Sequence, residues 1–213
     1  MTYHALPALG YLALFIWVLI TVNELSATHA APIYAHVATA LWAMFPILIG
    51  GTFHMAVVKD DAFRRLARPI HQKWFGSSKT WRGVLAMSLF SIVGAYSLDA
   101  LFGSTLAHAT FDFHKLTPME LGLALGVTFI LAELPNSYVK RRMGIPAGAR
   151  AERRQLVFTL GDQLDSVIAC GLLYVFGLGM PWTTFLVLLP VGVLSLLIVK
   201  RSLFHLGLKR APT

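Results

Sequence analysis

Long apolar stretches separated by short polar segments are the dominant pattern of this sequence. Five stretches approach or exceed the roughly 20 residues that an α-helix needs to cross a bilayer, and a sixth, 119–134, is shorter but nearly uninterrupted. The five long stretches are 5–22, 33–58, 83–102, 156–180 and 181–199. The pattern predicts an all-α integral membrane protein with about six transmembrane helices in a single polytopic domain covering residues 1–213.

The composition agrees with a lipid-facing chain. Of the 213 residues, 56% are hydrophobic and only 13% are charged, whereas soluble domains usually carry about 25% charged residues. Residues 1–6 contain no Lys or Arg, so the first apolar stretch lacks the charged start of a signal peptide and is expected to be retained.

The basic residues are distributed unevenly along the chain. With six helices, all but one of the 18 Lys and Arg residues fall on the same side of the membrane, in 59–82, 140–154 and 200–210. The exception is Lys115. Because cytoplasmic loops of membrane proteins are enriched in Lys and Arg, we predict a multi-pass protein of the cell membrane with both termini in the cytoplasm. Loops 59–82 and 136–155 would form a polar site facing the cytoplasm.

The net charge of +8 is therefore concentrated at one membrane face, where it has three candidate partners. Nucleic acid is the weakest of the three and is not expected as a partner, because no recognised nucleic-acid-binding fold or basic-aromatic groove motif is present. Anionic lipid headgroups and a phosphorylated substrate from the cytoplasm both remain open.

The first basic loop ends in a segment suited to phosphate. Lys79 provides a compact ammonium charge, and Arg82 provides a planar guanidinium group. Ser78 and Thr80 provide hydroxyl donors. Phosphate oxygens accept hydrogen bonds from this mixture of groups. The structural alternative is that Ser78 or Thr80 caps the start of a helix.

The second basic loop follows the fourth predicted helix. Pro135 and the residue after it are expected to break or kink this helix where it reaches the cytoplasm. Ser137, Lys140 and Arg141 come next, and they either bind phosphate or anchor the topology. Glu133, just before the proline, is interpreted as an ion-pair partner of Arg141 or as a further metal ligand.

Two carboxylates near the start of the fifth predicted helix are the strongest metal candidates. Asp162 and Asp165 are three residues apart and so share one helix face. Counted from Leu156, Asp162 lies about 9 Å along the helix, at a depth where acidic side chains usually face the protein interior or a wet cavity. Mg²⁺ would relieve their mutual repulsion, binding through one or two carboxylates plus substrate phosphates. Neutralisation by nearby Lys or Arg is the alternative.

Two further features have less specific interpretations. His54 lies near the cytoplasmic end of the second apolar stretch and could approach the polar site. Gly122 and Gly126 have the Gly-x-x-x-Gly spacing that permits close helix approach, either within the chain or at a homodimer contact.

Three short motifs, taken in order, resemble a known family. Residues 79–83 resemble the Lys-Thr-Trp-Arg-Gly motif of the CDP-archaeol synthase family, the small branch of the phosphatidate cytidylyltransferases. Residues 137–141 resemble the Ser-x-hydrophobic-Lys-Arg start of the cytidylyltransferase signature, and 162–165 resemble its closing Asp-x-x-Asp. The resemblance covers roughly residues 50–174. His71 stands where the family pattern has an aspartate, and the Asn-x-x-Pro element expected upstream is missing.

The resemblance implies a reaction in which CTP and a membrane lipid phosphate, phosphatidate or archaetidate-like, give a CDP-lipid and pyrophosphate. It implies that Asp162 and Asp165 hold Mg²⁺ and that Lys79 and Arg82 hold the triphosphate. Lys140 and Arg141 would then hold the acceptor phosphate or share the nucleotide, and Ser137 would donate a hydrogen bond.

Two other classes of function stay open at this point. One is a non-catalytic or diverged membrane protein of the same fold. The other is a small transporter of phosphorylated substrates, which often has repeated halves and charged or broken elements near the bilayer midplane. The chain has no internal repeat, and its charges gather at one face.

Overall fold

The computed structural model describes residues 18, 20, 21, 24, 32–146 and 155–207. This part of the chain is helical and contains no β-strand, only one isolated antiparallel bridge between Pro69 and Thr80. The elements are α2 (Pro32–Lys59), η1 (Arg64–Leu66), α3 (Gln72–Phe75), α4 (Trp81–Phe102), η2 (Leu106–His108), η3 (Phe113–Lys115), α5 (Pro118–Arg142), α6 (Gln155–Leu173), the π-helical η4 (Tyr174–Leu178) and α7 (Trp182–His205). The prediction of an all-α protein is confirmed.

Four of the described helices, α2, α4, α5 and α7, are long and apolar enough to cross a membrane. A shorter apolar helical stretch, Gln163–Leu178, belongs to α6 and η4. Apart from residues 18, 20 and 21, the first predicted span lies outside the described residues. The count of six spans and the cytoplasmic termini therefore stay predictions.

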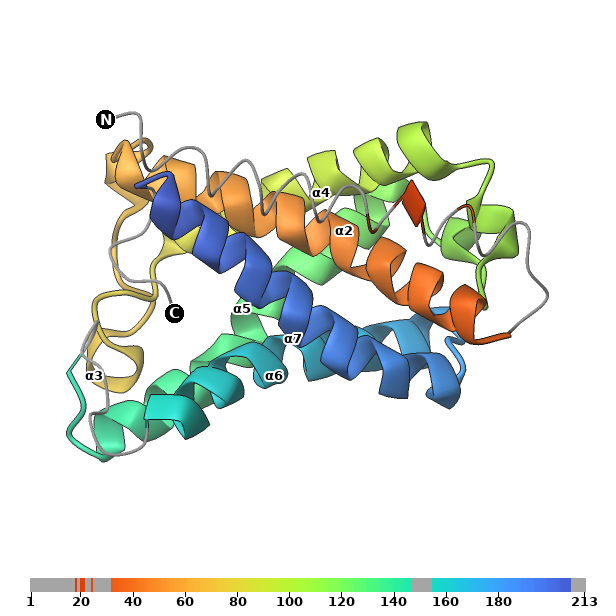
Figure 1. Cartoon of the computed structure of the whole chain (residues 1–213). Helices are drawn as coiled ribbons and strands as arrows, with labels where there is room; N and C mark the ends of the chain where they lie inside the picture. Colours follow the sequence, from red (N-terminus) through yellow and green to blue (C-terminus); the bar gives the residue numbers. More distant parts are fainter. Residues whose placement is uncertain (1–17, 19, 22–23, 25–31, 147–154, 208–213) are drawn as a thin grey trace.

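The five long helices form a closed ring of neighbours. Each of α2, α4, α5, α6 and α7 packs against the next, and α7 returns to α2 (Figure 1). Fully buried apolar side chains fill the interior, including those of Trp42, Met87, Leu125, Tyr174 and Leu188. The ring holds the ends of the helices together, so that residues distant in the sequence meet there.

Small residues bring α4 and α5 into backbone contact. A Cβ atom added to Gly122 would lie 2.3 Å from the Cα atom of Ile92, and one added to Gly126 would lie 2.5 Å from the Cα atom of Ser88. The Gly-x-x-x-Gly face is therefore used for packing within the chain, and it offers no support for a homodimer contact.

Substitution of Gly122 by alanine should destabilise the protein. Its Cβ would press on α4 backbone, which cannot move aside as a flexible side chain would, and overpacking of this kind costs about 1–3 kcal/mol. The matched control is Gly51→Ala in α2, where an added Cβ meets nothing within 4 Å. We expect a lower thermal midpoint in detergent for Gly122→Ala only, with no change in oligomeric state by light scattering. Equal midpoints for the two variants would contradict the close α4–α5 packing.

The described basic residues collect at one end of this bundle, called here the basic end. It comprises the C-terminal ends of α2, α5 and α7, the N-terminal ends of α4 and α6, and the α3 segment, all on the left in Figure 1. Lys115 lies at the other end, where its Nζ donates a hydrogen bond to the carbonyl of Leu178 over 2.6 Å. The predicted separation of charge is therefore confirmed for the described part of the chain.

Candidate active site at the basic end

The α2–α4 connection is closed at its base by backbone hydrogen bonds. The Ile70 amide donates to the Lys79 carbonyl over 2.8 Å, and the Trp81 amide donates to the Arg68 carbonyl over 3.1 Å. These bonds flank the Pro69–Thr80 bridge and enclose α3 in a loop. Lys79 is thereby held next to the first turn of α4 and cannot swing freely with the loop.

The Lys79 ammonium forms an ion pair with the Glu133 carboxylate of α5. Both side chains are largely buried, with 21% and 23% of their surface exposed. Glu133 therefore pairs with Lys79, and the predicted pairing with Arg141 is wrong. A carboxylate at this depth is costly without a counterion, so the pair ties the Lys79 loop to α5.

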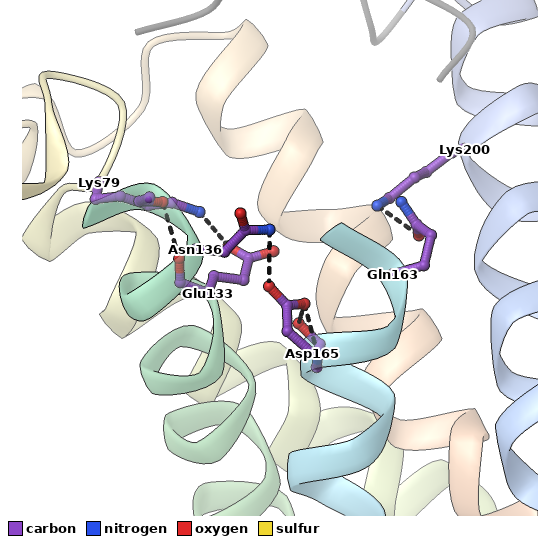
Figure 2. Close-up of polar contacts among 8 residues, drawn as sticks. Lys79, Glu133, Asn136, Gln163, Asp165 and Lys200 are labelled. Carbon is purple, nitrogen blue, oxygen red and sulfur yellow. Dashed lines mark hydrogen bonds and ion pairs between the residues drawn. The ribbon is translucent and has the colours of Figure 1, made fainter. Parts of the chain in front are cut away.

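Asn136, one turn further along α5, makes the contact to α6. Its Nδ2 donates to Oδ2 of Asp165 over 3.3 Å, and Oδ1 of Asp165 accepts from the Ser166 amide over 2.6 Å. Figure 2 shows this series of polar contacts running from the Lys79 loop through α5 to α6. Asp165 thus faces α5 and the Lys79 ion pair, as a shared site requires.

Asp162 lies one turn before Asp165 in α6, but its side chain lies outside the described residues. Its predicted role as a metal ligand therefore stays a prediction. Helices α5 and α6 approach each other closely at this level. A Cβ atom added to Gly161 of α6 would lie 3.9 Å from Nδ2 of Asn136 of α5.

α5 does not break at Pro135. The helix continues through it to Arg142, so of the predicted break or kink, the break is wrong. A proline removes one backbone donor and usually kinks a helix, but the chain stays helical on both sides of Pro135. Ser137, Lys140 and Arg141 consequently lie on the last two turns of α5, and not in a loop.

The predicted phosphate-binding residues of α5 have differing environments. The Ser137 hydroxyl is buried and donates to the Glu133 carbonyl of its own helix over 2.8 Å. The Arg141 guanidinium turns back and donates to the Ile145 carbonyl just beyond the helix. Lys140 is half-buried on the final turn. Ser137 and Arg141 are thus both bonded to backbone carbonyls near the end of α5.

Arg82 is directed to the turn that follows α2. Its Nη1 donates to Oδ1 of Asp61 over 2.7 Å and to the Ala62 carbonyl over 3.2 Å, and the residue is only 9% exposed. Asp61 has a φ of 49°, a left-handed conformation that non-glycine residues seldom adopt. The sequence carried no signal for this pair, because that turn geometry is not visible in the residue pattern.

The hydroxyl residues before α4 divide between capping and exposure. Thr80 caps α4, because its hydroxyl oxygen accepts a hydrogen bond from the Gly83 amide over 3.2 Å. Helix capping was the predicted alternative to phosphate binding for this residue. Ser78 is exposed on the turn before Lys79. His54 does approach this segment, since a Cβ added to Gly83 would lie 3.3 Å from its Nε2.

A second lysine that the motifs did not identify reaches the same region. Nζ of Lys200, near the end of α7, donates to Oε1 of Gln163 over 2.7 Å, and Gln163 lies between the two aspartates and is 2% exposed. Figure 2 shows Lys79 and Lys200 on opposite sides of the first turns of α6. The sequence placed Lys200 only among the basic residues of segment 200–210, because none of the three motifs includes it.

The donor set suits a hard cation bound together with substrate. Within the described residues, no group of three or more His, Cys, Asp or Glu side chains comes together to hold a metal. The acidic groups here are oxygen donors on two facing helices, which is the type of ligand that Mg²⁺ uses when it takes one or two carboxylates and fills its shell with water and phosphate oxygens. The residues present therefore fit Mg²⁺.

Comparison with known proteins decides the family. The family model of CarS-like CDP-archaeol synthase matches residues 70–211, a range that includes all three motifs and Lys200. The chain belongs to the CDP-archaeol synthase family. A curated CDP-archaeol synthase of Halorubrum lacusprofundi is 29% identical over 194 residues, covering 83% of this chain and 97% of the relative. No solved structure matches the chain.

One departure from the CDP-archaeol synthase pattern has a structural explanation. His71, which replaces an aspartate, is the N-cap of α3, and its Nδ1 accepts a hydrogen bond from the Trp74 amide over 3.2 Å. Aspartate is a preferred N-cap residue for the same reason, because its side chain accepts from the first free amides of a helix. A histidine at this position thus supplies the side-chain acceptor that caps α3.

Proposed function

We propose that this protein is a CTP-dependent cytidylyltransferase that converts a membrane lipid phosphate to a CDP-lipid and releases pyrophosphate. The acceptor proposed first is an archaetidate-like ether lipid phosphate, as the names of the family and of the Halorubrum relative suggest. Phosphatidate, its ester counterpart, presents the same phosphate monoester and is the alternative acceptor.

The observation that carries this proposal is the meeting of two distant motifs in one polar cluster. Lys79 of the Lys-Thr-Trp-Arg-Gly segment and Asp165 of the Asp-x-x-Asp segment are connected through two α5 side chains only one turn apart. A cation and a carboxylate placed together at the end of an apolar bundle suit a reaction between a phosphate compound from water and a lipid.

The chemistry proposed is an in-line phosphoryl transfer. An oxygen of the lipid phosphate forms a bond to the α-phosphorus of CTP, and the bond from that phosphorus to the bridging oxygen of the β-phosphate breaks, releasing pyrophosphate. The acceptor is already an oxyanion, so no protein nucleophile is required. Catalysis consists of positioning the reactants and neutralising their charge.

The residues of this chain divide these tasks between two sides of the site. Lys79, held in place by Glu133, would contact the triphosphate and stabilise the charge that develops on the leaving pyrophosphate. Arg82, held by Asp61, would support it from the same loop, with Ser78 and Thr80 as neighbouring hydroxyl groups. Lys140 would approach from the last turn of α5, and Asn136 keeps Asp165 oriented.

Asp162 and Asp165 would hold Mg²⁺, and the Ser166 hydroxyl, 3.2 Å from Oδ1 of Asp165, is a further oxygen donor beside them. When bound, the cation supplies charge neutralisation between the nucleotide phosphates. We further propose that the basic end faces the cytoplasm, because Lys and Arg are enriched on that side of membrane proteins and CTP is a cytoplasmic substrate.

A panel of acceptors tests the proposal. Purified protein in mixed micelles is incubated with CTP and Mg²⁺ and with a dialkylglycerol phosphate, a diacylglycerol phosphate or the corresponding neutral glycerolipid, and CDP-lipid is measured by mass spectrometry. We expect product from at least one lipid phosphate and none from the neutral lipid. Absence of product with both lipid phosphates would overturn the assignment.

A further inference from the structure

We propose that Lys200 binds the phosphate of the membrane-borne acceptor, while Lys79 serves the nucleotide. This inference rests on the proposed function and adds a residue to it, since Lys200 lies outside the three motifs. It assigns the two lysines on opposite sides of α6 to the two substrates.

The position of Lys200 along α7 places its ammonium at the level of lipid headgroups. Residues 183–199 of α7 contain no charged side chain, and Lys200 is the first charged residue after this apolar run. Leu186 and Leu194 of the same helix are 63% and 59% exposed, as side chains facing lipid would be. A cation at the end of such a run lies where the phosphate groups of bilayer lipids lie.

The side chain of Lys200 is nevertheless directed toward the protein and not along the membrane surface. Its Nζ donates a hydrogen bond to the side-chain carbonyl of Gln163 over 2.7 Å. Gln163 is an uncharged partner, and this bond orients the Lys200 ammonium toward the first turns of α6. A lysine serving only as a topological anchor would not need a buried amide to orient it.

The environment of Lys79 is different in a way that suits the nucleotide. Lys79 lies in the connection between α2 and α4, which is closed by the Pro69–Thr80 bridge, and the residue before it, Ser78, is exposed. Of the α5 residues first expected to hold the acceptor, Arg141 is engaged with the Ile145 carbonyl. Lys200, at the end of the apolar run of α7, is the cation that we assign to a phosphate arriving within the membrane plane.

The test separates the Michaelis constants of the two substrates. For Lys200→Met, which keeps the length of the side chain and removes its charge, we expect the KM for the lipid phosphate to rise about 10- to 100-fold, the effect of losing a charged hydrogen bond. The KM for CTP should change less than about twofold. Lys200→Arg should recover most of the affinity for the acceptor. Arg201→Met, at the exposed neighbouring position, is the matched control and should leave both constants unchanged.

Binding without turnover gives an independent measurement. Tryptophan fluorescence of the protein in nanodiscs is titrated with dialkylglycerol phosphate in the absence of CTP, and Lys200→Met should bind it at least about 10 times more weakly than wild type. An unchanged acceptor constant, an equal rise in both KM values, or an effect no larger than that of Arg201→Met would overturn the inference. Wild-type protein that forms no CDP-lipid would instead overturn the proposed function.

Discussion

Replacing Asp165 with asparagine should reduce CDP-lipid formation by about 100-fold or more, since removing one preorganised electrostatic group from an active site has effects of this size. The change removes one negative charge and almost no volume. The remaining amide oxygen can keep the hydrogen bond from the Ser166 amide, and a flip of the Asn136 amide lets its oxygen accept from the new Nδ2 in place of the present bond. The loss should therefore be catalytic, with a thermal midpoint close to that of wild type, and initial rates of CDP-lipid formation measure it.

Asp99→Asn provides the matched control for this variant. Asp99 is also an aspartate of a long helix, but it lies at the other end of the bundle, where His114 Nε2 is 3.0 Å from its carboxylate. Its substitution should leave the rate of cytidylyl transfer unchanged. Wild-type rates for Asp165→Asn would remove this carboxylate from the proposed chemistry.

Loss of Lys79 should produce the second large effect, on both activity and stability. Lys79→Met leaves the Glu133 carboxylate buried without its ion-pair partner, and breaking a buried pair in this way costs about 3 kcal/mol. For a chain of this size, that corresponds to a thermal midpoint lower by roughly 6–12 °C. The rate of CDP-lipid formation should fall about 100-fold or more, because the charge on the leaving pyrophosphate loses its counterion.

The double variant Lys79→Met with Glu133→Gln separates these two effects. Removing the orphaned charge should restore most of the thermal midpoint, while activity should stay low because the cation is still missing. Recovery of activity in the double variant would show that Lys79 acts only through the fold. A midpoint that stays low would show that the ion pair is not the cause of the destabilisation.

Much of the fold was predictable because lipid imposes a simple rule on the sequence. An apolar stretch of bilayer length must be helical to satisfy its backbone hydrogen bonds, and α2, α4 and α7 coincide closely with the apolar stretches 33–58, 83–102 and 181–199. The clustering of basic residues likewise predicted which helix ends lie together. The first stretch, 5–22, is not covered by the described residues.

The candidate site was only partly predictable, and Pro135 shows why. Interpreting it as a helix break assigned Asn136 to a loop and hid its relation to Glu133. In a continuous α5 these two residues are three apart and share a face, which is how one contacts Lys79 and the other Asp165. Whether neighbouring helices hold a proline-containing helix together is a tertiary property that the local sequence does not encode.

Partners of isolated charged residues were equally invisible to pattern analysis. Asp61 contacts Arg82 from a turn with left-handed backbone conformation, and Lys200 contacts Gln163 from another helix. In both pairs the spacing along the chain is arbitrary, so only the fold brings the residues together. Motifs identified Lys79 and Asp165 because each belongs to a short recurring string.

The most direct test of the whole account follows the phosphorus atoms of CTP. Purified wild-type protein is given lipid phosphate and Mg²⁺ with CTP labelled in either the α- or the γ-phosphate, and label is measured in the lipid and aqueous phases. We expect α-label in the lipid and γ-label in pyrophosphate, in equal molar amounts. Label transfer of either kind to the lipid without pyrophosphate release, or no transfer at all, would contradict cytidylyl transfer at the basic end.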